Sequence, residues 1–323
     1  MVRIRGWGSY LPLYRIERTA IADQHGGYAG GGEVAVPAHD EGVVGLGVSA
    51  AENALEHAGV DGADLDAVYA ASTSDPFDER GIAPHVAVAV DAEGPVRVTD
   101  CQGSARAATN AVLAARDTVD AGRAETVLVV GTDARRADAG TAEEQTAGAG
   151  AGALVLGTDG DAGAIESAAT NTTGFVGRFQ RAGESPLPGD GRFNRARYVE
   201  AVTGAIATLD VSPDHAALPA PDGGWGDRAL SAAEIDAEVH STFDAVGDAG
   251  AASVLIDAAY ALETASPGDT LLLATFGPGG SDAVELSRGE AATPEMDVAD
   301  YLDSKEYVTY AKHRAYREEG GEA

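Results

Sequence analysis

The sequence predicts an α/β protein made of two similar halves. Segments with the two-residue period of strands alternate with segments of helical spacing along the chain, the order that a mostly parallel sheet requires. No linker of disordered composition separates the halves, and 44% of the 323 residues are hydrophobic, enough for one shared core. We therefore expect an N-terminal half over 1–160 and a C-terminal half, ending in a tail, over 161–323.

In the first half, β-branched and alternating apolar residues predict strands, and apolar residues at helical spacing predict helices. The expected strands are 2–6, 65–71, 95–100, 125–131 and 153–157. The expected helices are 43–58, 83–90 and 105–115. Gly59 stands where a glycine commonly ends a helix, directly after the first of these. Residues 23–42 are rich in glycine and are expected to form an irregular loop.

The second half repeats this pattern. The expected strands are 162–168, 215–218, 270–276 and 282–286, and the expected helices are 198–208, 231–243 and 251–265. Residues 170–197 are rich in Gly, Pro and Arg and are expected to be irregular. The tail, 298–317, is expected to be one helix whose tyrosines pack against the rest of the protein.

The composition is strongly acidic. There are 52 acidic and 22 basic residues, a net charge of −30, and Lys305 and Lys312 are the only lysines. Such a protein repels phosphate backbones, which argues against nucleic acid as a partner. We interpret the charge as adaptation to a salt-rich cytosol, as in halophiles, since the Debye length falls to about 3 Å at 1 M salt and screens the repulsion between like charges.

Cysteine usage and hydropathy limit the remaining classes. A single cysteine excludes an internal disulfide and suits a reducing cytoplasm, and no run of about 20 apolar residues predicts a membrane span. The N-terminus lacks the apolar core of a signal peptide, so we expect a cytoplasmic protein that does not bind membranes. No His, Asp or Glu grouping has metal-ligand spacing, so the sequence predicts no metal.

The cysteine, Cys101, is the first candidate functional residue. It follows the expected strand 95–100 and precedes the expected helix 105–115, a strand-to-helix turn. Unpaired N–H groups and the positive end of a helix dipole favour a thiolate there, as a nucleophile needs. The alternative is an ordinary buried cysteine that acts as a small apolar residue.

Seven segments, taken in order, resemble the thiolase superfamily. They are GWGSYLPLYRI (6–16), VTDCQGSARAATNAV (98–112), TAGAGAGALVLG (146–157), GDGRF (189–193), GDAGAAS (247–253), ALETASPGDTLLLATFGPGGSDAVEL (261–286) and KEYVTYAKHRAYR (305–317). The resemblance is to the archaeal-type hydroxymethylglutaryl-CoA synthases and the type III ketoacyl-ACP synthases. It implies a five-layered αβαβα fold from two duplicated βαβαβαββ halves, paired as a homodimer.

The resemblance also implies a chemistry. An acyl-CoA acyltransferase or condensing enzyme of mevalonate (isoprenoid) or lipid metabolism would carry its acyl group as a thioester on Cys101. Covalent capture divides one difficult step into two easier ones. Coenzyme A thioesters would be the substrates, with no tightly bound cofactor.

Three positions depart from the family pattern. The glutamate of the synthases is matched by Thr73, their histidine by Pro219 and their asparagine by Asp248. His215, four residues before Pro219, is a distant substitute at the other end of a short strand. Glu79 follows Thr73 and is expected on the surface. Losing a base or an oxyanion donor costs about 10²-fold or more each, which puts the condensation step in doubt.

Two further expectations follow from the resemblance. Arginines concentrate at 178, 181, 192, 195 and 197, and Arg178, Arg192 and Arg195 are candidates for binding the phosphates of coenzyme A. Their alternative role is pairing with surface carboxylates. The competing function is a catalytically reduced paralogue that acts as a scaffold in a complex with a thiolase and a zinc-ribbon/OB-fold protein.

Overall fold

The computed structural model describes residues 1–181, 184–187 and 190–319. Its strands are β1 (Val2–Tyr10), β2 (Tyr14–Glu17), β3 (Glu33–Val36), β4 (Ala67–Ser72), β5 (Arg97–Gln102), β6 (Thr126–Ala134), β7 (Ala149–Gly157), β8 (Gly163–Thr172), β9 (His215–Ala217), β10 (Glu238–Val239), β11 (Thr270–Gly277), β12 (Gly280–Arg288) and β13 (Glu306–Tyr307). Its helices are α1 (Arg18–Gln24), α2 (Val43–Ala58), α3 (Ala83–Ala89), α4 (Ala107–Asp120), α5 (Gly191–Ile206), α6 (Trp225–Ala232), α7 (Phe243–Val246), α8 (Ser253–Thr264), α9 (Val298–Asp303) and α10 (Tyr310–Glu319).

The main sheet repeats one strand order. Across its ten strands the order is β10-β9-β11-β12-β8-β1-β7-β6-β4-β5. Outward from β1 the order is β1-β7-β6-β4-β5, and outward from β8 it is β8-β12-β11-β9-β10. Each half therefore begins with its first strand at the middle of the sheet, continues with its last two strands and ends with its two remaining strands at the edge. The two halves join where β1 pairs with β8. The prediction of a mostly parallel sheet is wrong, because the antiparallel pairs β6–β7 and β11–β12 occupy the centre of each half.

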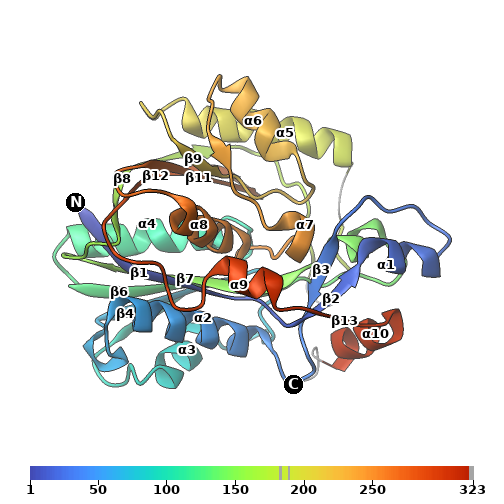
Figure 1. Ribbon diagram of the computed structural model, residues 1–323, viewed down its shortest axis with the longest axis horizontal. Helices are drawn as coiled ribbons and strands as arrows, with labels where there is room; N and C mark the ends of the chain where they lie inside the picture. Colours follow the sequence, from blue (N-terminus) through green and yellow to red (C-terminus); the bar gives the residue numbers. More distant parts are fainter. Residues whose placement is uncertain (182–183, 188–189, 320–323) are drawn as a thin grey trace.

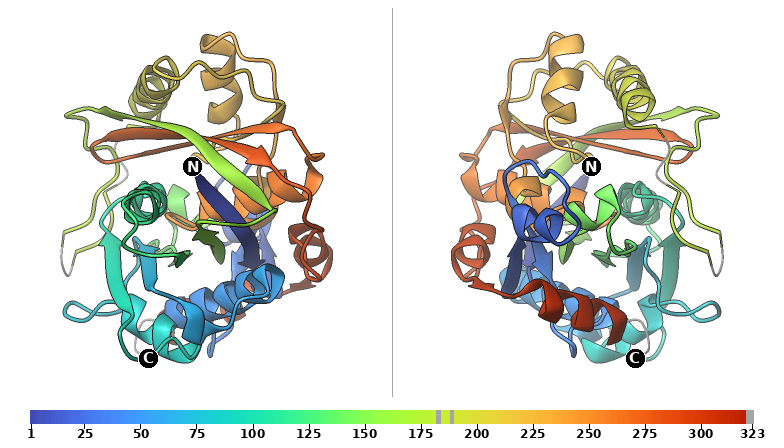
Figure 2. Two further views of the ribbon diagram at one scale, coloured as in Figure 1. Left: turned by 90° about the vertical axis from the view of Figure 1, so that its left-hand side faces the viewer. Right: turned by 90° about the vertical axis from the view of Figure 1, so that its right-hand side faces the viewer.

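Helices and sheet form five layers (Figure 1). α2 and α3 cover the outer face of one half of the sheet, α5 and α6 cover the outer face of the other, and α4 and α8 lie between them. Figure 2 shows the same central pair of helices from both ends. The thiolase-like α/β fold expected from the sequence is therefore confirmed.

The central layer explains the composition of α4 and α8. α8 is buried along almost its whole length, and α4 buries alanines at 107, 108, 111 and 115. Both helices contact strands of the two halves, so they must be apolar on opposite sides, and small residues let both sheets approach closely. The expected helix 43–58 is α2, ended by Gly59 at a φ of 61°, in the left-handed conformation that favours glycine.

Several local predictions are wrong where distant pairing overrides local pattern. The expected loop 23–42 contains β3, which pairs with β2, and the expected helix 231–243 is the end of α6 followed by β10 and α7. The helix expected at 198 begins at Gly191, with Asp190 as its N-cap, inside the region expected to be irregular. The tail is two helices, α9 and α10, separated by β13. The GDGRF segment begins at Gly189, which lies outside the described residues.

The tail packs onto a small second sheet. β13 adds to β2 in the three-stranded sheet β13-β2-β3, and α10 contacts α1 and β3. None of the helices in the described part of the chain combines the length and the apolar character that a membrane span needs.

Candidate active site

Cys101 lies inside β5. Its backbone pairs with that of Ala71 in β4, and β5 continues to Gln102. The expectation that the cysteine stands near a helix start is wrong, because α4 begins only at Ala107. The thiol is half-buried and packs against the central core between the two halves. Burial, and then the charge of Asp100, raise the pKa of this thiol, so its surroundings favour the protonated form.

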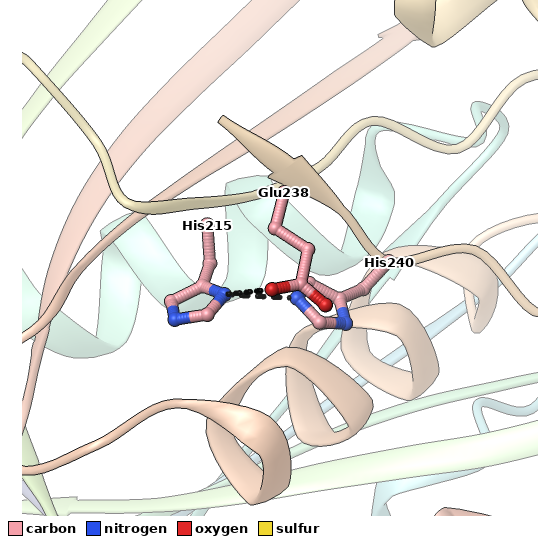
Figure 3. Close-up of side chains that lie close together, drawn as sticks. All are labelled: His215, Glu238 and His240. Carbon is pink, nitrogen blue, oxygen red and sulfur yellow. Dashed lines mark hydrogen bonds and ion pairs between the residues drawn. The ribbon is translucent and has the colours of Figure 1, made fainter. Parts of the chain in front are cut away.

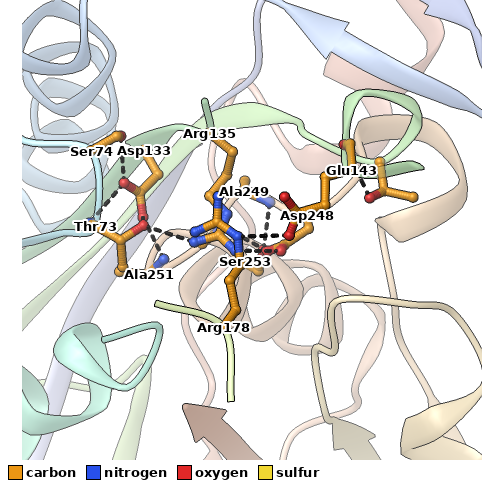
Figure 4. Close-up of polar contacts among 12 residues, drawn as sticks. Thr73, Ser74, Asp133, Arg135, Glu143, Arg178, Asp248, Ala249, Ala251 and Ser253 are labelled. Atoms are coloured by element: carbon orange, nitrogen blue, oxygen red, sulfur yellow. Dashed lines mark hydrogen bonds and ion pairs between the residues drawn. The ribbon is translucent and has the colours of Figure 1, made fainter. Parts of the chain in front are cut away.

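The carboxyl ends of three parallel strands meet beside the cysteine. β4 lies between β5 and β6, and its register pairs Ala71 with Gly131. Two residues beyond this pair, Thr73 and Asp133 lie side by side. The Thr73 backbone N–H donates to Asp133 Oδ1 at 2.8 Å and its hydroxyl donates to Oδ2 at 3.1 Å. Thr73 is therefore fixed by a carboxylate of the neighbouring strand (Figure 4).

Asp133 is the centre of a buried polar network. Besides Thr73 it accepts hydrogen bonds from the Ser72 hydroxyl (2.9 Å), the Ser74 hydroxyl (2.6 Å) and the Ala251 N–H (2.5 Å). Both serine oxygens also accept a backbone N–H, so their protons must point at Asp133. A group that faces only donors is held as a carboxylate. Burial raises the pKa of Asp133, and the Ser74 hydrogen bond and the Arg135 charge offset part of that rise.

Arg135 connects this network to the position matched to the family asparagine. Its Nη1 donates to Thr73 Oγ1 at 3.1 Å, and its Nη2 donates to Asp248 Oδ2 at 2.9 Å. Burial by itself would lower the pKa of Arg135, but the carboxylates of Asp248 and Asp133 outweigh it and raise the pKa. Asp248 also accepts the Gly250 N–H at 2.9 Å. The structure thus joins two predicted site residues, Thr73 and Asp248, through Asp133 and Arg135, which sequence analysis missed.

A cavity of about 500 Å³ opens beside this network, between the two halves. Its lining includes Thr73, Arg135 and Ser104 and, on the apolar side, Trp225 and Phe276. The segment after the cysteine, 103–105, also lines it, whereas Cys101, Asp248 and Pro219 do not. A mostly apolar cavity with a few polar groups in its wall is suited to a small organic ligand.

The arginine candidates separate into two places. Arg178 lines the cavity, where its Nε donates to Glu143 at 3.1 Å. Burial, and then the neighbouring charge of Arg135, lower the pKa of Arg178. Arg192 and Arg195 lie on α5 and line a separate shallow groove with Arg228. The remaining two cations of the group make surface ion pairs, Arg181 with Glu184 and Arg197 with Glu200.

His215 is far from this site. It pairs with Leu271, near the start of β11, whereas the cavity is lined by Phe276 and Gly277 at the other end of that strand. Its expected position at the far end of a short strand is confirmed, and it contacts His240 rather than the cavity residues. Glu79 is exposed, as expected.

The comparisons with known proteins agree with the fold. A hydroxymethylglutaryl-CoA synthase of Methanopyrus kandleri is 30% identical over 335 residues, which covers 97% of this chain and 96% of the relative. The solved structure "MvaS in complex with 3-hydroxy-3-methylglutaryl coenzyme A" superposes with a TM-score of 0.81 at 21% identity, covering 98% and 91% of the two chains. The 3-oxoacyl-(acyl carrier protein) synthase III of Pseudomonas aeruginosa gives a TM-score of 0.80 at 21% identity over 89% and 98%. No protein-family model matches the chain.

Proposed function

The chain belongs to the hydroxymethylglutaryl-CoA synthase family of condensing acyltransferases, and we propose that it carries its acyl group as a thioester on Cys101. The observation that carries the proposal is the position of the thiol. It is half-buried, it faces the core between the two halves, and the residues that follow it line the cavity. A thioester formed there is shielded from bulk water on the side of the core.

The capture step needs few groups. The Cys101 sulfur attacks the carbonyl carbon of an acyl-CoA, the bond from that carbon to the coenzyme A sulfur breaks, and the thiol proton passes to the departing thiolate. The products are acyl-Cys101 and free coenzyme A. Because the pKa of Cys101 is raised, we expect capture to be slow at neutral pH and faster at alkaline pH.

The condensation step lacks the expected base. Thr73 has no ionisable group, and its hydroxyl donates to Asp133 and accepts from Arg135. Asp248 is held in an ion pair with Arg135 at 2.9 Å, so it offers a carboxylate whose charge is already neutralised. We therefore propose that acyl transfer is retained and that condensation is slower by about 10²-fold or more relative to a chain with a glutamate at position 73.

Coenzyme A recognition and dimer formation belong to the same proposal. Arg178 lies in the cavity wall, and Arg192 and Arg195 lie on the adjacent helix, α5. We propose that these arginines bind the phosphates of coenzyme A.

The same proposal includes a homodimer formed through β5. This strand is at the edge of the sheet, with Val98 38% exposed, so its outer backbone groups are free to pair with the same strand of a second copy. Light scattering of the purified protein would give the mass of the assembly.

Intact-protein mass spectrometry tests acyl capture. The wild type, Cys101→Ser and the control Thr99→Ser, a change on the same strand, are incubated with acetyl-CoA or acetoacetyl-CoA in molar KCl. We expect a mass increase of one acyl group in the wild type and in the control, and none in Cys101→Ser. An adduct that persists in Cys101→Ser would contradict the assignment of the carrier.

A second candidate function is the scaffold. The observation in its favour is that Thr73 and Asp248 are both fixed in a network with Asp133 and Arg135 (Figure 4). If folded wild type takes up no acyl group from either thioester, the scaffold is favoured over the enzyme. Copurification with a thiolase and a zinc-ribbon/OB-fold protein from the source cells would then be the supporting result.

A further inference from the structure

Three metal-ligating side chains converge at the edge of the main sheet, away from the cavity. They are His215 on β9, Glu238 on β10 and His240 directly after β10 (Figure 3). One ligand atom from each lies within 4.8 Å of the other two. The cavity lining reaches Phe276 on β11, whereas His215 pairs with Leu271, so the cluster lies about 17 Å along the strand from that lining, at about 3.3 Å per residue.

The strand pairing explains why these side chains share one face. His215 and Glu238 are direct partners in the parallel pair of β9 and β10. His240 is two residues beyond Glu238, and its backbone N–H donates to Ala216, which continues the ladder. Because side chains alternate along a strand, Glu238 and His240 point the same way, and direct partners do too. The backbone therefore preorganises the three groups before any ligand arrives.

The distances are close to those of a tetrahedral zinc site. His215 Nδ1 and His240 Nε2 are 3.0 Å apart, and His215 Nδ1 is 3.8 Å from Glu238 Oε2. Zinc–nitrogen and zinc–oxygen bonds of about 2.0–2.2 Å place neighbouring ligand atoms about 3.3–3.6 Å apart. The first of the two distances lies a few tenths of an ångström below this range and the second lies slightly above it. Two imidazoles that face each other must share one proton, and a bound cation would replace it.

A second observation points the same way. The other ring nitrogen of His215, Nε2, lies 3.2 Å from Asp269 Oδ2, in the turn before β11. A carboxylate that holds the outer nitrogen of a histidine orients the inner nitrogen toward a metal, and this arrangement is usual at zinc sites. The ring of His240 packs edge-to-face against the ring of Tyr260, with the two centroids 5.6 Å apart.

We propose that His215, Glu238 and His240 bind one Zn²⁺, with Asp269 as the positioning residue of His215 and water as the fourth ligand. Both histidines are buried while Glu238 is exposed, which leaves one side open to solvent. Two imidazoles and one carboxylate suit Zn²⁺ better than Mg²⁺ or Ca²⁺, which prefer oxygen ligands. The ion would fasten β10, an edge strand of two residues, to β9. This site is separate from Cys101, so a test of zinc binding and a test of acyl transfer can each fail without affecting the other.

Zinc titration of the full-length protein, after removal of metal with a chelator, tests the site. We expect the wild type to take up one Zn²⁺ per chain in calorimetry, with a rise of a few degrees in the unfolding temperature. We expect His240→Gln to weaken binding by more than about 100-fold, and Asp269→Asn by about 10–100-fold. His39→Gln, at an exposed histidine elsewhere, is the matched control and should bind as the wild type does.

A spectroscopic measurement keeps the test independent of folding defects. Co²⁺ in place of Zn²⁺ should give the intense visible absorption of a tetrahedral site in the wild type and in His39→Gln, and circular dichroism should show His240→Gln to be folded without metal. Wild type that binds zinc no more tightly than folded His240→Gln would overturn the proposal. So would a control variant that loses as much affinity as His240→Gln, or a cobalt spectrum typical of six oxygen ligands.

Discussion

Replacing Asp133 by asparagine should destabilise the protein strongly, although the two side chains have nearly the same shape. Asp133 is fully buried and accepts five hydrogen bonds, from Ser72, Ser74, Ala251 and both donor groups of Thr73. In Asp133→Asn, the amide oxygen can keep the three donors on the Oδ1 side. The amide N–H groups would then face two donors on the Oδ2 side.

The magnitude follows from those two lost contacts. A hydrogen bond to a charged group contributes about 1.5–3 kcal/mol, and removing one of the two carboxylate charges beside Arg135 adds to the loss. We expect a decrease of about 3–5 kcal/mol in the free energy of unfolding.

Urea denaturation followed by circular dichroism would measure this change. Asp138→Asn, at an exposed position in the loop after β6, is the control and should shift the free energy of unfolding by less than about 0.5 kcal/mol. A loss below about 1 kcal/mol in Asp133→Asn would refute the reasoning, because it would mean that the donors are satisfied without a carboxylate. In that case the fixed position of Thr73 would also lose its explanation.

Three further predictions concern backbone, pH and salt. Gly250→Ala should lower the free energy of unfolding by about 2 kcal/mol or more, because Gly250 has a φ of 56° and the added Cβ would lie 2.2 Å from Asp133 Oδ2. Gly30→Ala is the control in the same urea titration and should leave the stability unchanged, because its added Cβ would have no atom within 4 Å. Burial raises the pKa of Glu263 to about 8 from an ordinary value of 4.5, so the folded protein favours the protonated side chain. The contribution of Glu263 to the free energy of unfolding should therefore fall as the pH rises from about 5 to 9. Glu263→Gln should reduce that slope, and an unchanged slope in thermal unfolding at several pH values would contradict the assignment. Because the net charge is −30, the unfolding temperature should rise when KCl is increased from about 0.1 to 1 M, and a flat response would argue against adaptation to salt.

The local sequence determined the elements whose stability depends on near neighbours. The helix over 43–58, ended by Gly59, follows from apolar spacing and one left-handed glycine, and it lies at the predicted residues. The alternation of strands and helices, with the order of the family-like segments, was also sufficient for the α/β fold. These features depend on contacts within about four residues along the chain, or on motifs carried by single segments.

The tertiary structure decided what depends on pairing between distant segments. The local pattern predicted that the strand before the cysteine ends at Asp100. In the structure, pairing with β4 extends β5 through Cys101, so the thiol lies six residues before the start of α4. Asp133 and Arg135 belong to the site because β6 ends beside β4, and the only signal in the sequence was a charged pair at the end of an apolar strand.

The zinc-site candidate shows the same limit most clearly. His215 stands 23 residues before Glu238 and 25 before His240, a spacing that suggested no ligand set and led to the prediction of no metal. Only the parallel pairing of β9 with β10 brings the three side chains onto one face. Sequence patterns report which face of an element is apolar, whereas the partner of an edge strand is chosen by the packing of the whole sheet.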